Sequence, residues 1–339
     1  MESLLQESPA GLYCPQGDFY VDPWRRVSRA VITHAHADHA RTGMDQYLTT
    51  EDGHRVLRRR VGNSAHIDTI PYGTTLTING VRVSLHPAGH VLGSAQVRME
   101  YQGYVVVISG DYKVLHDATC RPFEPVRCNA FVSECTFGLP VFRWPNPDEV
   151  FEQINQWWRQ TRDRGETAVI FAYSLGKAQR ILESLDPSIG PILCHRAVEE
   201  LNEDYRDTGV TLPETTVPDH RQKSTRPEGA IIIAPPAAQD SSWLKPFGIC
   251  STATASGWMM IRGTRRWMSV DRGFVLSDHA DWPGLLKAIS ATDAEKVLVT
   301  HGRTGPMVRW LREKGIDSNS LSTKFTGESQ EAESGETLP

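Results

Sequence analysis

A dense group of histidine and aspartate side chains constrains this chain more than any other feature of its sequence. The apolar segment 30–33 predicts a short buried strand, and it runs directly into His34-Ala35-His36-Ala37-Asp38-His39. Three imidazoles and one carboxylate within six residues must lie close in space, and they form a ligand set suited to Zn²⁺. A lone histidine is most often an ordinary hydrogen-bonded residue, but a cluster this dense predicts a metal site at a strand end.

Three further residues occur in the same setting as this cluster. His90, Asp111 and His301 each follow an apolar segment and each stand beside glycine, which permits close approach of the backbone. Six residues cannot complete the coordination of two metal ions, so additional ligands are expected at other strand ends. Each of the three is a weak signal alone, but together with the cluster they supply enough ligands for two sites.

The pattern of apolar residues changes twice along the chain. Residues before about 144 read as short strands separated by Gly, Pro and Asp turns, whereas strands and helices alternate over about 145–270, which predicts a parallel α/β unit. Short strands return after 270. The expected strands are 81–86, 97–101, 105–109, 130–133, 168–173, 192–194, 230–234, 274–276 and 296–300, and the expected helices lie within 145–165, 197–207, 282–290 and 305–314.

Composition excludes several classes of protein. The 339 residues suffice for a large core, no apolar run is long enough to cross a membrane, and the first ten residues lack the features of a signal peptide. We therefore expect a cytoplasmic protein, with six reduced and mostly buried cysteines. The net charge of −5 includes four glutamates in the segment 326–339, an acidic, apolar-poor tail that is expected to be disordered.

The order of the candidate ligands resembles the metallo-β-lactamase superfamily, in which an HxHxDH motif precedes a His, a bridging Asp and a final His. The resemblance implies an α/β fold: a metallo-β-lactamase αββα sandwich formed by residues 1–143 and 271–325, with an α/β domain inserted at 144–270. It also implies two Zn²⁺ ions per chain, with Mn²⁺ as an alternative, and a hydroxide between them. One ion would be held by His34, His36, His90 and Asp111, and the other by Asp38, His39, Asp111 and His301.

Asp22, in Tyr20-Val21-Asp22-Pro23, matches an acidic residue that orients the histidine cluster in this superfamily. Metal-bound imidazoles usually donate their second N–H to a carboxylate or carbonyl, which is the role that the resemblance assigns to Asp22. The alternative is an ordinary turn aspartate before a proline.

Two segments resemble motifs of the β-CASP nuclease branch, which includes Artemis and the polyadenylation endonuclease. They are Ser133-Glu134-Cys135-Thr136 and Ser277-Asp278-His279-Ala280-Asp281. The resemblance implies that Glu134 orients His279, and that His279 contacts the scissile phosphate or protonates the leaving oxygen. An imidazole suits this task because its pKa lies near neutral pH. The alternative is an exposed ion pair.

Several loops and basic segments are candidates for nucleic-acid contacts. Ser174, Gly176 and Lys177 lie on a turn from strand to helix, where backbone N–H groups can bind phosphate. Ser256 and Gly257 lie on a second loop of small residues, followed by Arg262, Arg265 and Arg266, which alternate with Trp258 and Trp267. These tryptophans are equally consistent with a core. The helix expected around Arg55, Arg58, Arg59 and Arg60 is either a solvated face or a further contact.

Residues 120–125 and the segments around Glu134 and His279 are similar to the bacterial ligase-associated DNA exonucleases. The resemblance implies a DNA exonuclease that serves DNA repair beside an ATP-dependent DNA ligase and a helicase, with single-stranded DNA or duplex ends as substrate. A histidine at position 301 is more typical of RNA-cutting β-CASP proteins, so a ribonuclease remains an alternative. A small-molecule ester hydrolase of the same superfamily is the other enzyme alternative, and a non-catalytic scaffold would require broken ligand motifs.

Overall fold

Two units, each with its own sheet structure, make up the described part of the chain. The computed structural model describes residues 4–218, 228–239, 241–263 and 268–325. Unit 1 contains the residues up to Arg143 and again from His279, and unit 2 is Trp144–Asp278. The sequence placed the second junction after residue 270. It lies eight residues later because β16 (Arg272–Phe274) pairs with β15 (Cys250–Ala255) in the sheet of unit 2.

Unit 1 contains two sheets. The first has six strands in chain order, antiparallel from β1 to β3 and parallel from β3 to β6. The second has seven strands in the order β18-β17-β11-β10-β9-β8-β7, parallel from β18 to β10 and antiparallel from there to β7. The strands are β1 (Gln6–Ser8), β2 (Gly11–Cys14), β3 (Phe19–Val21), β4 (Arg29–Val31), β5 (Gln46–Thr50), β6 (Ile67–Ile70), β7 (Thr75–Ile78), β8 (Val81–Pro87), β9 (Ala95–Tyr101), β10 (Tyr104–Ile108), β11 (Ala130–Glu134), β17 (Lys296–Thr300) and β18 (Asp317–Ser320).

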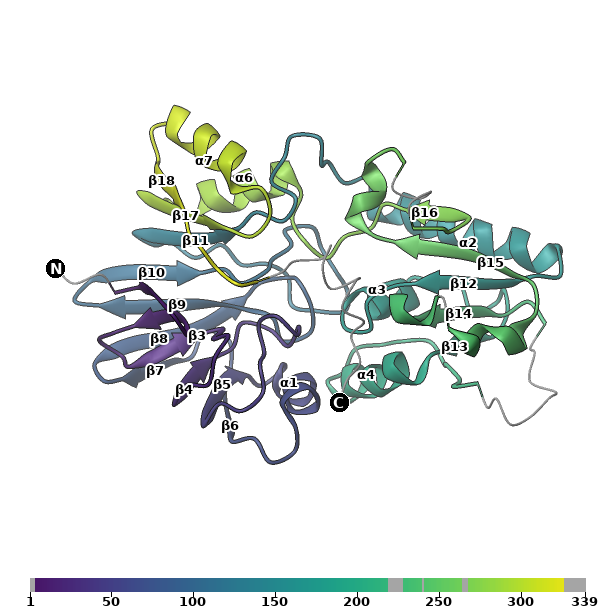
Figure 1. Ribbon diagram of the computed structural model, residues 1–339, viewed down its shortest axis with the longest axis horizontal. Helices are drawn as coiled ribbons and strands as arrows, with labels where there is room; N and C mark the ends of the chain where they lie inside the picture. Colours follow the sequence, from purple (N-terminus) through teal and green to yellow (C-terminus); the bar gives the residue numbers. More distant parts are fainter. Residues whose placement is uncertain (1–3, 219–227, 240, 264–267, 326–339) are drawn as a thin grey trace. The chain divides into compact units, whose positions relative to one another are not determined.

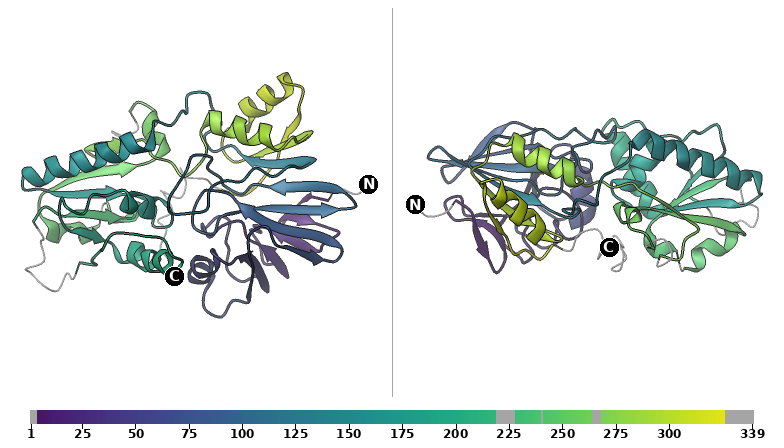
Figure 2. Two further views of the ribbon diagram at one scale, coloured as in Figure 1. Left: turned by 180° about the vertical axis from the view of Figure 1, so that it is seen from behind. Right: turned by 90° about the horizontal axis from the view of Figure 1, so that it is seen from above.

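The second sheet of unit 1 is buried on both faces. Alternate residues of β11 point in opposite directions, so Val132 packs between the two sheets while Phe131 packs under α6 (Trp282–Ala291) and α7 (Thr304–Glu313). This double burial explains why its central strands are continuous apolar runs. The helix α1 (His54–Val61) contacts β5 and β6 of the first sheet. Figures 1 and 2 show α6 and α7 along one side of the second sheet and the first sheet along the other.

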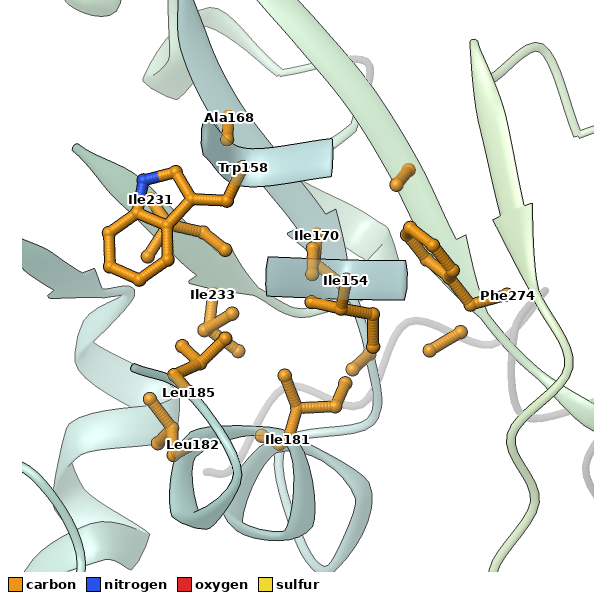
Figure 3. Close-up of a cluster of buried hydrophobic side chains, with 14 of the residues drawn as sticks. Ile154, Trp158, Ala168, Ile170, Ile181, Leu182, Leu185, Ile231, Ile233 and Phe274 are labelled. Atoms are coloured by element: carbon orange, nitrogen blue, oxygen red, sulfur yellow. The ribbon is translucent and has the colours of Figure 1, made fainter. Parts of the chain in front are cut away.

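Unit 2 is a parallel α/β unit. Its five strands run in the order β13-β14-β12-β15-β16, and every neighbouring pair is parallel. Helices α2, α3 and α4 contribute to the core on one face, which contains Ile154 and Trp158 of α2 against Ile170 of β12 (Figure 3). The remaining elements are α2 (Pro147–Asp163), α3 (Lys177–Glu183), α4 (Arg196–Asp207), β12 (Thr167–Phe171), β13 (Ile192–Cys194) and β14 (Ile231–Ala234).

The helix α2 begins where its sequence indicates. Asn146 caps it by accepting a hydrogen bond from the backbone of Asp148, and Pro147 occupies the first helical position, where no N–H is needed. The predicted strands and helices of unit 2 are confirmed to within a few residues, but β15 was missed. Its sequence, CSTATA, lacks the large apolar residues that usually mark a buried strand, although it pairs with β12 on one side and with β16 on the other.

No helix within the described ranges is both long enough and apolar enough to cross a lipid bilayer. The six cysteines are all free thiols, and four of them are buried. The segment 326–339, which is expected to be disordered, lies outside the described residues. Arg265, Arg266 and Trp267 lie outside them as well.

Candidate metal centre

The loop after β4 carries the histidine cluster. The strand β4 is parallel to both its neighbours, and the loop that follows is fixed at its base because Thr33 donates its backbone N–H and its hydroxyl to Asp22, over 2.8 and 2.5 Å. The backbone then turns tightly, with the N–H groups of His39 and Ala40 donating to the carbonyl of His36. This turn brings His34, His36, Asp38 and His39 together as buried side chains.

His34, His36, His90 and Asp111 form the first ligand group. The Nδ1 atom of His36 lies 3.1 Å from Nε2 of His34 and 3.1 Å from Nε2 of His90, and Nε2 of His34 lies 3.7 Å from a carboxylate oxygen of Asp111. Two nitrogens bound to one tetrahedral Zn²⁺ at 2.0–2.1 Å would be about 3.3 Å apart. The four donor atoms therefore face a common centre of the size that a metal ion needs.

Asp38, His39 and His301 form the second ligand group, and Asp111 adjoins it. The Nε2 atom of His39 lies 3.6 Å from Asp38 and 3.5 Å from Asp111, and Nε2 of His301 lies 3.6 Å from the other oxygen of Asp111. In the described part of the chain, Nε2 of His39, Nε2 of His301 and Oδ1 of Asp111 are buried without a hydrogen-bond partner. Such atoms are costly to bury unless something binds them, so this group also fits a metal ion.

Charge in the centre favours a cation. Burial, followed by the charge on His39, lowers the pKa of His34 far below its ordinary value and lowers that of His301 to about 3. Both imidazoles are therefore neutral, which is the form that binds metals. Burial also acts to lower the pKa of His39, but Asp38, Asp111 and Asp22 outweigh it and raise the value to about 10. Burial raises the pKa of Asp111 to about 7. A cation between the carboxylates would offset this cost of burying their charge.

Asp22 contacts the cluster as the sequence predicts. One of its oxygens lies 2.7 Å from Nδ1 of His39, and the residue adopts a left-handed backbone conformation with a φ of 45°. The same carboxylate binds the backbone and side chain of Thr33. Asp22 therefore holds both the base of the loop and the orientation of one imidazole, so that Nε2 of His39 is turned toward Asp38 and Asp111.

Glu134 and His279 form a buried pair beside the first ligand group. Both oxygens of Glu134 lie 3.0 Å from Nδ1 of His279, and the backbone N–H of Tyr112 donates to the same carboxylate over 2.7 Å. Burial would raise the pKa of Glu134, but His279 and the hydrogen bonds lower it overall. The rings of His279 and His90 have centroids 4.7 Å apart. Since the pair is buried, the alternative of an exposed ion pair is wrong.

The backbone after β17 is tightly constrained. His301 and Gly302 both have positive φ angles, 61° and 56°, and a Cβ atom at Gly302 would lie 2.5 Å from the carbonyl oxygen of Cys135. Histidine is one of the residues that adopt a positive φ more often than most, so His301 can take up this backbone conformation. Position 302 has no room for a side chain, which explains the glycine there. This close approach positions His301 against the loop that follows β11.

We predict that Gly302→Ala destabilises unit 1. The left-handed backbone and the contact with the Cys135 carbonyl together should cost about 2–4 kcal/mol of folding free energy. Thermal unfolding of the chelator-treated protein would measure the loss. Gly305→Ala is the matched control, because no atom other than those of its chain neighbours and its own helix backbone lies within 4 Å of its Cβ position, and its φ is not positive. Equal melting temperatures for the two variants would contradict the prediction.

The candidate nucleic-acid contacts lie in unit 2, apart from those on α1. Gly176 caps α3 with a φ of 92°, and the hydroxyl of Ser174 is buried without a hydrogen-bond partner in the described residues. Lys177 is only 1% exposed and lies 3.7 Å from Asp278. Ser256 caps a short 3-10 turn that begins at Gly257, and Arg262 is exposed. The two residues before this turn, Thr254 and Ala255, end the strand β15.

Sequence reasoning did not select three residues that lie at the candidate metal centre or in the loop of Asp111. Lys113 and Asp117 form a buried ion pair, 3.1 Å apart, in the loop that carries Asp111. Phe325 stacks on His39 and His301 at the metal centre. An isolated lysine, aspartate or phenylalanine outside any motif offers no pattern by which it could be selected.

Comparison with known proteins gives partial matches. No family model matches the chain. A probable DNA ligase of Opitutus terrae is 30% identical over 310 residues, which are 91% of this chain and 30% of that protein. The endoribonucleases YSH1 of Saccharomyces cerevisiae and Yarrowia lipolytica are each 32% identical to this chain over 122 residues. Each match covers 35% of this chain, and it covers 15% of the Saccharomyces protein and 14% of the Yarrowia protein. The chain thus spans less than a third of the length of these relatives.

A crystal structure of a protein of unknown function from Enterococcus faecalis has a similar fold. Its TM-score is 0.58 at 9% sequence identity, and the match covers 88% of this chain and 80% of that one. At this identity the likeness concerns the mixed α/β fold alone.

Proposed function

We propose that this chain is a metal-dependent phosphodiesterase of the β-CASP branch of the metallo-β-lactamase superfamily, and that it cleaves DNA as an exonuclease. One observation carries the proposal: two buried ligand groups meet at Asp111, and the Glu134 and His279 pair lies beside them. Two metals with a shared carboxylate and an adjacent imidazole suit in-line displacement at a phosphodiester. The names of the relatives, endoribonuclease and probable DNA ligase, support a nucleic-acid substrate.

The proposed fold is an αββα sandwich with an inserted domain. Unit 1 would be the metallo-β-lactamase domain, and unit 2 the β-CASP domain. The layering of helices α6 and α7, two sheets and helix α1 supports this assignment.

Each residue of the centre has a defined task in this proposal. Two divalent ions, Zn²⁺ or Mn²⁺, would when bound neutralise the phosphate oxygens and activate a water molecule. One would be held by His34, His36, His90 and Asp111, and the other by Asp38, His39, Asp111 and His301. Asp22 keeps His39 turned toward its partners.

His279 would supply the proton that the leaving oxygen needs. Its Nδ1 faces the carboxylate of Glu134, so the proton to be transferred is the one on Nε2. Glu134 holds the ring in place and stabilises its protonated form. We propose no other role for Glu134, whose oxygens also accept the backbone N–H groups of Tyr112 and Thr136.

Contacts to the nucleic-acid backbone are proposed in unit 2. The buried hydroxyl of Ser174, which has no hydrogen-bond partner in the described residues, and the exposed side chain of Arg262 support contacts at these two loops. The proposed contacts also include Gly176, Lys177, Ser256 and Gly257, together with Arg265 and Arg266, which lie outside the described residues. We further propose a cytoplasmic repair enzyme that works with an ATP-dependent ligase and a helicase. In its support, a segment similar to 91% of this chain forms part of a protein named a probable DNA ligase.

Digestion of end-labelled oligonucleotides tests the proposed function. Single-stranded DNA and RNA of one sequence, labelled at the 5′ or 3′ end, are incubated with Zn²⁺, Mn²⁺ or Mg²⁺ and resolved to single nucleotides. We expect the DNA to be shortened from one end with Zn²⁺ or Mn²⁺. An Asp38→Ala, His39→Ala double variant should be inactive while remaining folded by circular dichroism.

Three results would overturn parts of the proposal. Full activity in the double variant would exclude the metal centre as the site of cleavage. Faster digestion of RNA would make the chain a ribonuclease, as the similarity to the endoribonucleases would then suggest. Internal cuts without end shortening would exclude exonuclease action.

A further inference from the structure

The segment that follows β18 leads back to the metal centre. Leu321 donates its backbone N–H to Val299 over 2.8 Å, and the hydroxyls of Thr323 and Thr300 lie 2.6 Å apart. Val299 and Thr300 are the last residues of β17, directly before His301. The segment 321–325 is therefore fixed along the same strand end that presents a metal ligand, and it places Phe325 at the second ligand group.

The ring of Phe325 lies parallel to two imidazoles at once. Its centroid is 4.3 Å from that of His39 and 4.9 Å from that of His301, at interplanar angles of 7° and 6°, and the two imidazole centroids are 5.3 Å apart. A ring stacked between them would hold them about 7 Å apart, twice the ordinary stacking distance of about 3.5 Å. Both imidazoles therefore lie against the same face of the phenyl ring.

The two imidazoles differ in what else holds them. Nδ1 of His39 is bound by Asp22, whereas neither ring nitrogen of His301 has a hydrogen-bond partner in the described residues. Metal-binding histidines almost always donate their second N–H to a carboxylate, carbonyl or water. For His301 the described structure offers instead an aromatic face. Since a metal-bound imidazole is electron-poor and the phenyl face is electron-rich, metal binding strengthens this contact.

We propose that Phe325 is a positioning residue for the second metal ion. By stacking on both His39 and His301 it keeps their rings nearly coplanar, so that their Nε2 atoms point toward Asp38 and Asp111. The residue touches neither the substrate nor the ion, and it acts through the two imidazoles. The proposal rests on the metal centre proposed above and adds to it a selective control of one of its two ions.

Metal titration of Phe325 variants tests the proposal without using activity. The metal-free protein is titrated with Zn²⁺ against a chromophoric chelator, and with Co²⁺ followed by absorption spectroscopy. Phe325→Ala should weaken binding of one ion about tenfold or more and leave the other unchanged, in the range seen when groups that orient metal ligands are removed. Phe325→Leu fills the space without a planar face, so its binding of that ion should remain weak. Phe325→Tyr keeps the planar face, so it should bind the ion as tightly as the wild type does.

Three further variants identify the ion and control for folding. Asp38→Asn marks loss of the second ion and His36→Asn loss of the first, so Phe325→Ala should reproduce the Asp38→Asn titration. When Phe325→Ala is combined with Asp38→Asn, the double variant should bind metal hardly more weakly than Asp38→Asn alone, because both substitutions act on the same metal site. Trp310→Ala is the folding control, because it removes a partly buried aromatic side chain of unit 1 that packs on Trp282. This variant should bind both ions as tightly as the wild type does.

The outcomes separate this inference from the proposed function. Failure of the wild-type chain to bind two ions would overturn the proposed metal centre itself. Two ions bound equally tightly by the wild type and by Phe325→Ala would overturn the positioning role alone. Unchanged metal binding with faster DNA cleavage would also overturn it, since Phe325 would then obstruct the substrate. A fall in both affinities together with a lower melting temperature of the metal-free protein would reduce Phe325 to a general structural role.

Discussion

An Asp111→Asn variant is expected to lose about 10³-fold or more of the proposed nuclease activity, because it should lose both metal ions together. The carboxylate of Asp111 lies near donor atoms of both ligand groups: one oxygen is 3.7 Å from His34 and 3.5 Å from His39, and the other is 3.6 Å from His301. An amide has the same shape but presents only one neutral oxygen, which cannot offset two dications.

The measurement combines metal content with cleavage of labelled DNA. Elemental analysis of the purified variant should find less than one tightly bound ion per chain, and activity should return only in part at high metal concentration. Asp117→Asn is the matched control, since Asp117 is a buried carboxylate of the same loop that pairs with Lys113. It should lower thermal stability and retain both ions. Two tightly bound ions in Asp111→Asn would show that another group bridges them.

A His279→Ala variant is expected to keep both metal ions and to cleave DNA about 10²–10⁴-fold more slowly, the range for loss of a general acid. The deficit should depend on the leaving group. A thymidine 5′-phosphate ester of p-nitrophenol releases an anion that needs no proton, so the variant should cleave it at close to the wild-type rate. Glu134→Gln should show the same selectivity in weaker form, because it leaves the imidazole present but poorly oriented.

One alternative is built into this experiment. Asp111, Glu134 and His279 are themselves close enough to hold a metal ion. If His279 were a ligand, His279→Ala would lose metal and would be slow on both substrates. A uniform loss of rate at full metal content would instead assign His279 to binding of the phosphate.

The side chains of the proposed metal centre could be selected from the sequence because metal coordination imposes a local pattern. His34 to His39 are close in space whatever the fold, and Glu134 and Asp111 stand at the ends of strands whose apolar runs are easy to recognise. In unit 2, α2 and β13 were likewise predicted because capping residues and apolar periodicity are local signals. In these cases the physical cause of the structure lies within a few neighbouring residues.

The features that could not be predicted depend on distant contacts. The strand β15 consists of small residues and is defined by its pairing with β12 and β16, and the junction at Asp278 depends on the pairing of β16 with β15. The stacking of Phe325 joins residues nearly 300 positions apart in the chain. No local pattern in the sequence records such a contact, since many exposed or half-buried phenylalanines would look the same.

The position of unit 2 in the sequence separates the proposed metal ligands from the proposed catalytic pair. All seven proposed metal ligands belong to unit 1, whereas the proposed catalytic pair brackets the insert: Glu134 lies ten residues before Trp144, where the insert starts, and His279 is the first residue after its end. An exchange of the insert would therefore leave the proposed ligands covalently undisturbed, while strain in the returning chain would reach the proposed proton donor, His279, through the single peptide bond that joins it to Asp278. Through this connection, a change in the insert would affect the proposed protonation step separately from the proposed metal ligands.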